Sequence, residues 1–212
     1  NRGIRNKDIK YYVDVVTAIR DALHPDTDLA IDAHWAYTPV DILKVAKELE
    51  HLDLLWLEDP VPAENVEAML RVKNSTRTPI CTGENFYTRH GFRELIQSQA
   101  TDIVTPDIAK AGGLLESKRI AELADLYYMP LAPHNICSPI GTYAMMHVCA
   151  SVPNFLALEF HHLDNELWSN LTEEGPIIVD GHINVPENPG LGITLDEEVV
   201  KNATKESLGF FD

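Results

Sequence analysis

The 212-residue sequence predicts an α/β fold, a (β/α)8-type (TIM) barrel of which six strand-and-helix units are present. Six polar residues each end a short apolar run at a nearly constant spacing: Asp32, Glu58, Glu84, Asp107, His134 and Glu159. The interval from the first to the second of these residues equals that from the second to the third. Amphipathic helical patterns separate the apolar runs, and strands that alternate with helices in this way form a parallel sheet. Barrel enzymes carry their reacting groups at the C-terminal ends of the strands.

The chain opens with an expected helix over residues 9–23, because apolar side chains recur there at spacings of three and four. This helix ends before the turn cluster His24-Pro25-Asp26, and the first apolar strand follows and ends at Asp32. The other helices are expected at about residues 40–52, 66–74, 91–98, 114–128 and 142–151. The last three strands are expected over residues 102–107, 129–134 and 155–160.

Six strands are fewer than the eight of a closed barrel, so the natural polypeptide is expected to extend upstream of Asn1. Residues 1–172 are predicted to form a partial barrel, the catalytic domain. From residue 173 the sequence becomes rich in turn residues, with Gly175-Pro176 and Pro189-Gly190 as examples. Residues 173–212 are therefore interpreted as a C-terminal tail that packs outside the barrel or against a domain absent from this sequence.

Composition excludes several classes of partner. A formal net charge of −16 opposes binding to nucleic acid phosphates. No apolar run approaches the roughly 18 residues of a membrane-spanning helix, and the chain does not open with a signal peptide, so a soluble, cytoplasmic protein is expected. Cys81, Cys137 and Cys149 are an odd number without metal-site spacing, which favours reduced thiols over a disulfide framework.

Asp32, Glu58 and Glu84 end three successive strands and would bring three carboxylates to one edge of the sheet. Mg²⁺ prefers such hard oxygen ligands and keeps positions open for water and substrate, whereas zinc would call for more His or Cys. For any one of these residues the alternative is a simple helix cap. Their equal spacing favours a Mg²⁺ site, which would also allow an anionic substrate despite the acidic chain.

His134 and Asp107 end neighbouring strands, and a carboxylate beside an imidazole makes a competent general base. The alternative for His134 is a structural hydrogen bond after Pro133. Glu159 ends the next strand, where it would exchange a proton with a substrate oxygen or act as a structural carboxylate.

His34 lies two residues after Asp32, and in an extended segment both side chains would point to the same face. It is interpreted either as the acid that protonates a leaving group or as a supporting loop residue. Tyr87 and Arg89, in the loop after Glu84, are predicted to touch substrate. His161 and His162 are weaker candidates that would line the barrel rim.

Six motifs together resemble those of the enolase superfamily, in its mandelate racemase subgroup: Asp32-Ala33-His34, Trp56-Leu57-Glu58-Asp59-Pro60, Gly83-Glu84-Asn85, Thr105-Pro106-Asp107, Ala132-Pro133-His134-Asn135 and Leu158-Glu159. The resemblance covers about residues 9–189. It implies a modified TIM barrel in which the three carboxylates bind Mg²⁺, Asp107 and His134 form the base dyad and Glu159 assists. It also implies a homo-oligomer. Family members carry an N-terminal capping domain and a Lys-x-Lys strand, and neither is in this sequence.

The Asp-x-His motif is similar to that of the sugar-acid dehydratases of this subgroup, such as gluconate, galactonate and arabinonate dehydratases. The resemblance therefore implies Mg²⁺-dependent dehydration of a sugar acid (aldonate) to a 2-keto-3-deoxy acid, through removal of the C2 proton and an enediolate intermediate. Three alternatives stay open. They are a racemase or epimerase of a 2-hydroxy acid, a non-catalytic barrel fragment, and a zinc-dependent barrel hydrolase, which the lack of a His-x-His strand end disfavours.

Overall fold

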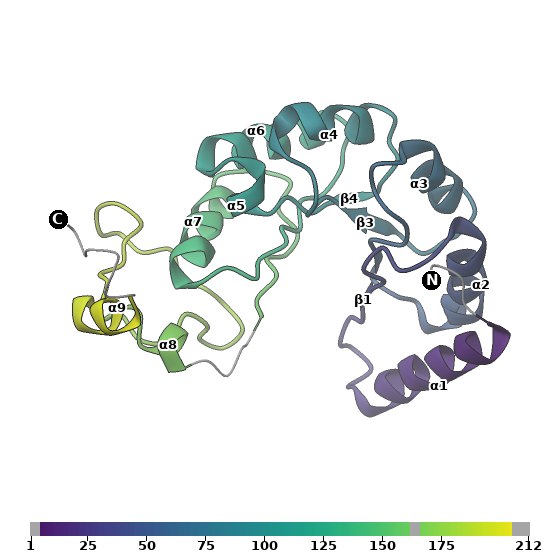
Figure 1. Cartoon of the computed structure of the whole chain (residues 1–212), viewed down its shortest axis with the longest axis horizontal. Helices are drawn as coiled ribbons and strands as arrows, with labels where there is room; N and C mark the ends of the chain where they lie inside the picture. The colour runs from purple at the N-terminus through teal and green to yellow at the C-terminus, as the bar shows by residue number, and fades with distance from the viewer. Residues whose placement is uncertain (1–4, 162–165, 205–212) are drawn as a thin grey trace.

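The computed structural model describes residues 5–161 and 166–204. In Figure 1 the elements follow one another around an open arc, with β1, β3 and β4 on the inner side of the helices. The helices are α1 (Asn6–Ala22), α2 (Pro39–Leu49), the 3₁₀-helix η1 (Glu50–Leu52), α3 (Val66–Lys73), α4 (Thr88–Gln97), α5 (Ile108–Ala111), α6 (Leu114–Asp125), α7 (Pro139–Ala150), α8 (Glu166–Ser169) and α9 (Glu197–Ala203). The strands are β1 (Ile31–Asp32), β2 (Leu57–Glu58), β3 (Ile80–Thr82) and β4 (Ile103–Val104).

The strands form a parallel sheet in the order β1-β2-β3-β4, and the register places Asp32 opposite Glu58. Isolated parallel bridges continue this sheet from Val104 to Leu131 and from Leu131 to Phe155. The six predicted strand positions therefore lie side by side in chain order, as they do in a β/α barrel. The structure confirms the α/β barrel-type fold, here as a partial barrel.

The last two strand positions are reduced to single bridging residues, although the sequence predicts full strands. Pro130 and Pro133 flank Leu131, and proline has no amide hydrogen to give to a ladder. The backbone still joins the neighbouring segments, because the amide of Ala132 donates to the carbonyl of Val104 at 3.0 Å. The segment at Leu131 thus stays next to β4, and the segment at Phe155 stays next to Leu131, because the amide of Leu156 donates to the carbonyl of Leu131 at 2.8 Å.

The predicted helices are present, with ends that differ by a few residues. α4 begins at Thr88 rather than near residue 91, and α7 begins at Pro139 rather than near residue 142. Proline suits the first turn of a helix, where an amide has no partner to lose. The sequence did not predict α5, since four residues are too few for an apolar period to show.

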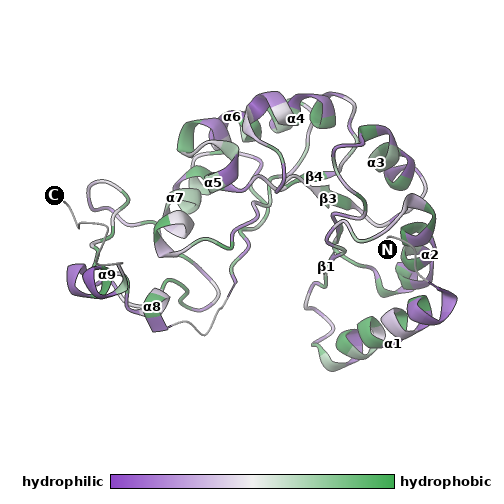
Figure 2. Cartoon of the chain, in the orientation of Figure 1, coloured by the Kyte–Doolittle hydropathy of each residue, from purple (hydrophilic) through white to green (hydrophobic). Residues whose placement is uncertain are grey.

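Four of the helices, α2, α3, α4 and α6, each bury one apolar face in the main core. Buried apolar residues recur at spacings of three or four in a core cluster that includes Ile42, Val45 and Leu49 of α2, Met69 and Val72 of α3, Phe92, Leu95 and Ile96 of α4, and Ile120 and Ala124 of α6. Figure 2 shows hydrophobic and hydrophilic residues on the same helices, for example α3 and α4. Each large buried side chain contributes about 1.5–3 kcal/mol, so this core holds the strand ends in place.

The described part of the predicted tail contacts α7. His147 of α7 lies with its Nε2 atom 3.0 Å from the carbonyl oxygen of Leu191. Val179 and His182 form an antiparallel bridge within the tail, and Thr172 pairs in the same sense with Leu195. The boundary between residues 172 and 173 stays a prediction.

Within residues 5–161 and 166–204, no helix is both long and apolar enough to cross a membrane.

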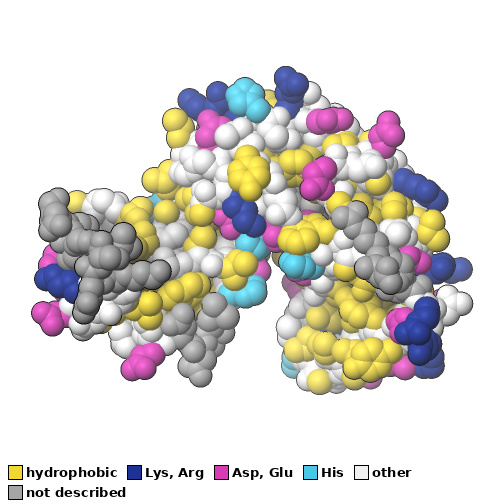
Figure 3. All heavy atoms as spheres, in the orientation of Figure 1, with side chains coloured by type: hydrophobic (Ala, Val, Ile, Leu, Met, Phe, Trp, Pro, Cys, Tyr) yellow, Lys and Arg dark blue, Asp and Glu magenta, His cyan; other side chains and the backbone are white. Residues whose placement is uncertain are grey.

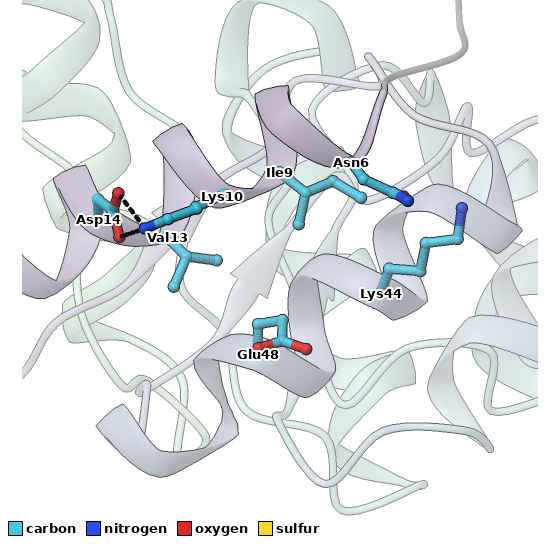
Figure 4. A pocket seen from close by; sticks show the side chains of 7 residues that line it. All are labelled: Asn6, Ile9, Lys10, Val13, Asp14, Lys44 and Glu48. Atoms are coloured by element: carbon cyan, nitrogen blue, oxygen red, sulfur yellow. Dashed lines mark hydrogen bonds and ion pairs between the residues drawn. The ribbon is translucent and has the colours of Figure 1, made fainter.

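A groove of about 490 Å³ lies between α1 and α2, where Ile9 and Val13 approach Lys44 and Glu48 (Figure 4). The side chains that line this groove come from these two helices, so it is separate from the strand ends that carry the predicted site.

Candidate active site

The first two predicted metal ligands lie side by side at the ends of β1 and β2. Asp32 and Glu58 are register partners in the parallel ladder. Together with Trp56 and Glu159, they line a cavity of about 300 Å³. This volume is at the lower end of those that hold small molecules. In Figure 3, acidic and histidine side chains gather along the inner side of the arc.

Burial and, after it, the neighbouring carboxylates Asp59 and Asp32 together raise the pKa of Glu58 to about 8, against a hydrogen bond from Trp56 that lowers it. The indole Nε1 of Trp56 donates to Oε2 of Glu58 at 3.2 Å. A carboxyl group in these surroundings resists ionisation without a nearby cation. The cluster at β1 and β2 therefore favours a positive charge.

Glu84, the third predicted ligand, follows β3 after Gly83 and is 5% exposed. Its Oε2 lies 3.1 Å from Nε2 of His134, and its Oε1 lies 3.4 Å from Nζ of Lys110. A side chain at position 83 would meet the backbone nitrogen of Thr105 at 2.9 Å, so glycine lets β3 and β4 approach closely there. Glu84 is thus held between two basic groups.

The predicted base dyad is assembled. Nδ1 of His134 lies 2.8 Å from Oδ2 of Asp107. The other oxygen of Asp107 caps α5 and accepts hydrogen bonds from the backbone amides of Ala109 and Lys110 at 2.8 and 3.0 Å. One carboxylate, three residues beyond the end of β4, therefore starts α5 and orients the imidazole, which leaves Nε2 of His134 directed at the acidic cluster.

These contacts shift both pKa values. Burial lowers the pKa of His134, but the hydrogen bond to Asp107 and the charges of Glu84 and Glu159 outweigh burial, so the pKa of His134 is raised. Burial also opposes ionisation of Asp107, and the hydrogen bonds from His134 and the Lys110 amide overcome it, so the pKa of Asp107 is lowered. An ionised Asp107 beside a basic imidazole suits proton transfer.

Glu159 is the second carboxylate near Nε2 of His134, with its Oε2 atom 4.0 Å from that nitrogen. The backbone amide of Asn135 donates to Oε2 of Glu159 at 2.8 Å, and Nε2 of His161 lies 2.9 Å from Oε1. The structure thus brings together Glu84, Asp107, His134 and Glu159, and His161 joins them at the rim.

The other predicted site residues lie apart from this group. The backbone at His34 is left-handed, with φ of 47°, because the amide of His34 bonds to Oδ1 of Asp32 at 2.7 Å. The segment is therefore not extended, contrary to the prediction. The ring of His34 lies against that of Trp35, with ring centroids 3.8 Å apart and ring planes tilted by 35°. Tyr87 is 65% exposed.

Arg89, predicted to touch substrate, is bound to a residue of α6. Its guanidinium lies 2.5 Å from Oε1 of Glu116, and its backbone amide donates to Oε2 of the same residue at 3.1 Å. A role in substrate binding stays a prediction for Arg89 as for Tyr87. His162 lies outside the described residues.

The sequence analysis gave no role to three residues at the site, although two of them, Asp59 and Asn135, stand in its motifs. Asp59 is 1% exposed and accepts hydrogen bonds from Trp35 and Thr82, and burial raises its pKa to about 6. Lys110 pairs with Glu84, and Asn135 holds Glu159. The position of Lys110 three residues after a strand-end aspartate was a usable signal, because that spacing returns to the same side of a helical turn.

Among residues 5–161 and 166–204, no three His, Cys, Asp or Glu side chains converge closely enough to mark a metal site by geometry alone. The chemistry of the donor set nevertheless fits Mg²⁺. Asp32 and Glu58 are aligned in register, and Glu84 follows on the next strand. Burial beside Asp59 and Asp32 raises the pKa of Glu58, and a cation would offset that effect. Carboxylates at neighbouring strand ends are the ligands that Mg²⁺ prefers.

The raised pKa of Glu58 predicts how stability depends on pH. In the folded state the pKa of Glu58 is about 8, above its ordinary value of 4.5. Between pH 4.5 and pH 8 the folded state therefore holds a proton that the unfolded chain releases. The free energy of unfolding without divalent cations should therefore be highest near pH 4.5 and fall by up to about 1.4 kcal/mol per pH unit towards pH 8. The pKa of Asp59 is raised to about 6, so this residue changes stability with pH in the same direction. Urea denaturation at pH 5, 6, 7 and 8 measures this; a midpoint that rises with pH would contradict it.

Comparison with known proteins gives consistent matches. Residues 2–199 match a family model described as enolase C-terminal domain-like. The D-xylonate dehydratase of Haloferax volcanii is 46% identical over 212 residues, which cover 100% of this chain and 52% of that protein. A D-galactonate dehydratase family member, RspA of Cellvibrio japonicus, is 35% identical over 195 residues, which cover 91% of this chain and 48% of that protein.

A crystal structure of a mandelate racemase/muconate lactonizing enzyme-like protein from Rubrobacter xylanophilus matches with a TM-score of 0.94 at 47% identity. The match covers 100% of this chain and 54% of that one. The chain thus spans about half the length of the proteins it matches.

Proposed function

Because this chain belongs to the enolase C-terminal domain-like family, with sugar-acid dehydratases among its relatives, we propose that the protein that carries it dehydrates an aldonate to a 2-keto-3-deoxy acid. The proposal includes Mg²⁺ as cofactor, a small sugar acid as substrate, a homo-oligomer and a cytoplasmic location. The observation that carries it is the dyad of Asp107 and His134, in which the second ring nitrogen, Nε2, faces the carboxylates at the strand ends.

Asp32, Glu58 and Glu84 would hold the metal ion. When bound, Mg²⁺ would supply positive charge that stabilises the negative charge developing on the substrate carboxylate as the C2 proton leaves. The pKa of Glu58 is raised by burial beside other carboxylates, so a cation here offsets repulsion that the fold already contains.

His134 moves the proton. Asp107 holds Nδ1 at 2.8 Å, which leaves Nε2 as the atom that takes the C2 proton or delivers one to the departing C3 hydroxyl. Glu159, fixed by the amide of Asn135, lies where it can exchange a hydrogen bond with a substrate oxygen near Nε2. His34 is the second candidate for protonating the leaving hydroxyl.

The test is a panel of aldonic acids, including gluconate, galactonate, arabinonate and xylonate, incubated with the full polypeptide that carries this sequence. Formation of 2-keto-3-deoxy acid with Mg²⁺, and its loss with EDTA, is the expected result. A polypeptide that binds Mg²⁺ but converts none of a complete stereochemical panel would overturn the proposal.

A racemase or epimerase of a 2-hydroxy acid is the second candidate function. The position of His34 supports this alternative. The ring of His34 lies against that of Trp35 in an exposed turn, and a racemase has no leaving group for it to protonate.

His34→Ala separates the two activities. For a dehydratase, loss of water should fall roughly a hundredfold while exchange of the C2 proton with D₂O continues, because only the leaving-group acid is removed. For a racemase, both C2 exchange and inversion should be unchanged. Proton NMR in D₂O follows exchange and product together, and His90→Ala on the exposed face of α4 is the matched control.

A further inference from the structure

Lys110 is a residue at the site to which the proposed mechanism assigns no role. It lies on α5, directly after β4, and its Nζ atom is 3.4 Å from Oε1 of Glu84. Its backbone amide donates to Oδ1 of Asp107 at 3.0 Å. Because Asp107 anchors the backbone of α5, the Cα and Cβ atoms of Lys110 have a fixed position near Glu84.

Both oxygens of Glu84 are in contact with basic groups, Oε1 with Lys110 and Oε2 with His134. The Glu84 side chain is 7% exposed, so its charge is shielded from water and depends on these partners. A cation that takes Glu84 as ligand must therefore share or replace one of the two contacts.

The two partners differ in how easily they can leave. The His134 side chain is 6% exposed and is tied to Asp107 through Nδ1. The Lys110 side chain is 35% exposed, and its long stem lets the ammonium group reach water without moving α5. Displacing Lys110 costs less than displacing His134, because its charge is hydrated again when it moves out.

We propose that Lys110 competes with the divalent cation for Glu84: it is the counter-ion that holds this carboxylate, and it moves out to solvent when the cation binds. The proposal rests on the proposed metal role of Glu84. Two positive groups on one carboxylate oxygen repel each other, so each weakens the binding of the other. Lys110 thereby lowers the affinity of the site for Mg²⁺ and keeps the buried carboxylate neutralised when the cation is released.

The test compares the full polypeptide with Lys110→Gln, which keeps a polar side chain of similar length and removes the charge. Isothermal titration with MgCl₂ should show affinity about tenfold higher for the variant, because the competing charge is gone. Lys47→Gln on the exposed face of α2 changes the net charge equally and should leave the affinity within a factor of two. An equal gain in both variants would mean a general charge effect and would overturn the proposal.

A second readout follows Lys110 itself. Reductive ¹³C-methylation labels the lysine amines, and the signal missing in Lys110→Gln identifies this residue. Addition of Mg²⁺ should move that signal towards those of solvent-exposed lysines, while the Lys47 signal stays in place. Mg²⁺ binding with unchanged affinity in Lys110→Gln and an unmoved Lys110 signal would overturn the competition alone. Absence of Mg²⁺ binding in both proteins would overturn it together with the metal assignment.

Discussion

His134→Asn is expected to lower the rate of C2 proton exchange and of 2-keto-3-deoxy acid formation by about a thousandfold. Asparagine can still bond to Asp107 but has no group that accepts and returns a proton near neutral pH. The Nε2 atom of His134 faces Glu84 at 3.1 Å, and among the described residues no other histidine ring nitrogen pairs with Asp107 or Glu84. The measurement is C2 deuterium incorporation in D₂O, with product formation in parallel.

Two further variants sharpen this prediction. Asp107→Asn should keep the hydrogen bond to Nδ1 but lose the charge that supports the protonated imidazole, and about a hundredfold loss is expected. His51→Asn, in the exposed 3₁₀-helix η1, should leave both rates unchanged. Continued C2 exchange at the parent rate in His134→Asn would show that another group is the base.

Glu58→Gln is expected to have opposite effects on stability and on metal binding. Without divalent cations at pH 8, the variant should be about 1–3 kcal/mol more stable than the parent, because it removes a buried ionisable group next to Asp59 and Asp32. Glutamine can still accept the hydrogen bond from Trp56. The parent should gain about 2.7 kcal/mol when Mg²⁺ is present at a hundred times its Kd, and the variant should gain almost nothing.

Thermal and urea denaturation with and without Mg²⁺ measure both effects. Glu94→Gln on the exposed face of α4 is the control, since it removes the same charge from a residue outside the site. The fall in stability from pH 5 to pH 8 should also become shallower in Glu58→Gln. A variant that keeps the full Mg²⁺-dependent gain would show that Glu58 is not a ligand.

The sequence by itself determined the class of fold and the positions of most of the reacting groups. Apolar runs that end in acidic residues or histidine, separated by amphipathic helices, are a local signal that needs no knowledge of tertiary contacts. The pairing of Asp107 with His134 followed in the same way, because neighbouring strands of a parallel barrel end at the same edge. The helix limits were predicted within a few residues, since their apolar faces have a clear period.

Most side-chain contacts around these groups were not predicted from the sequence. Lys110 and Asp59 join the site only because α5 turns back on Asp107 and because Asp59 is buried beside Thr82. His34 lies in a left-handed turn that a hydrogen bond to Asp32 creates, so its side chain does not follow the alternation of a strand.

The division has a physical reason. Local patterning decides which segments become strands and helices, because burial of an apolar face depends on the spacing of residues along one segment. The direction of a charged side chain depends on partners far away in the chain, and the free energies of these contacts differ by only a few kcal/mol. Sequence therefore determined where the carboxylates and His134 stand on the barrel, whereas only the tertiary structure decided that Glu84 lies between His134 and Lys110.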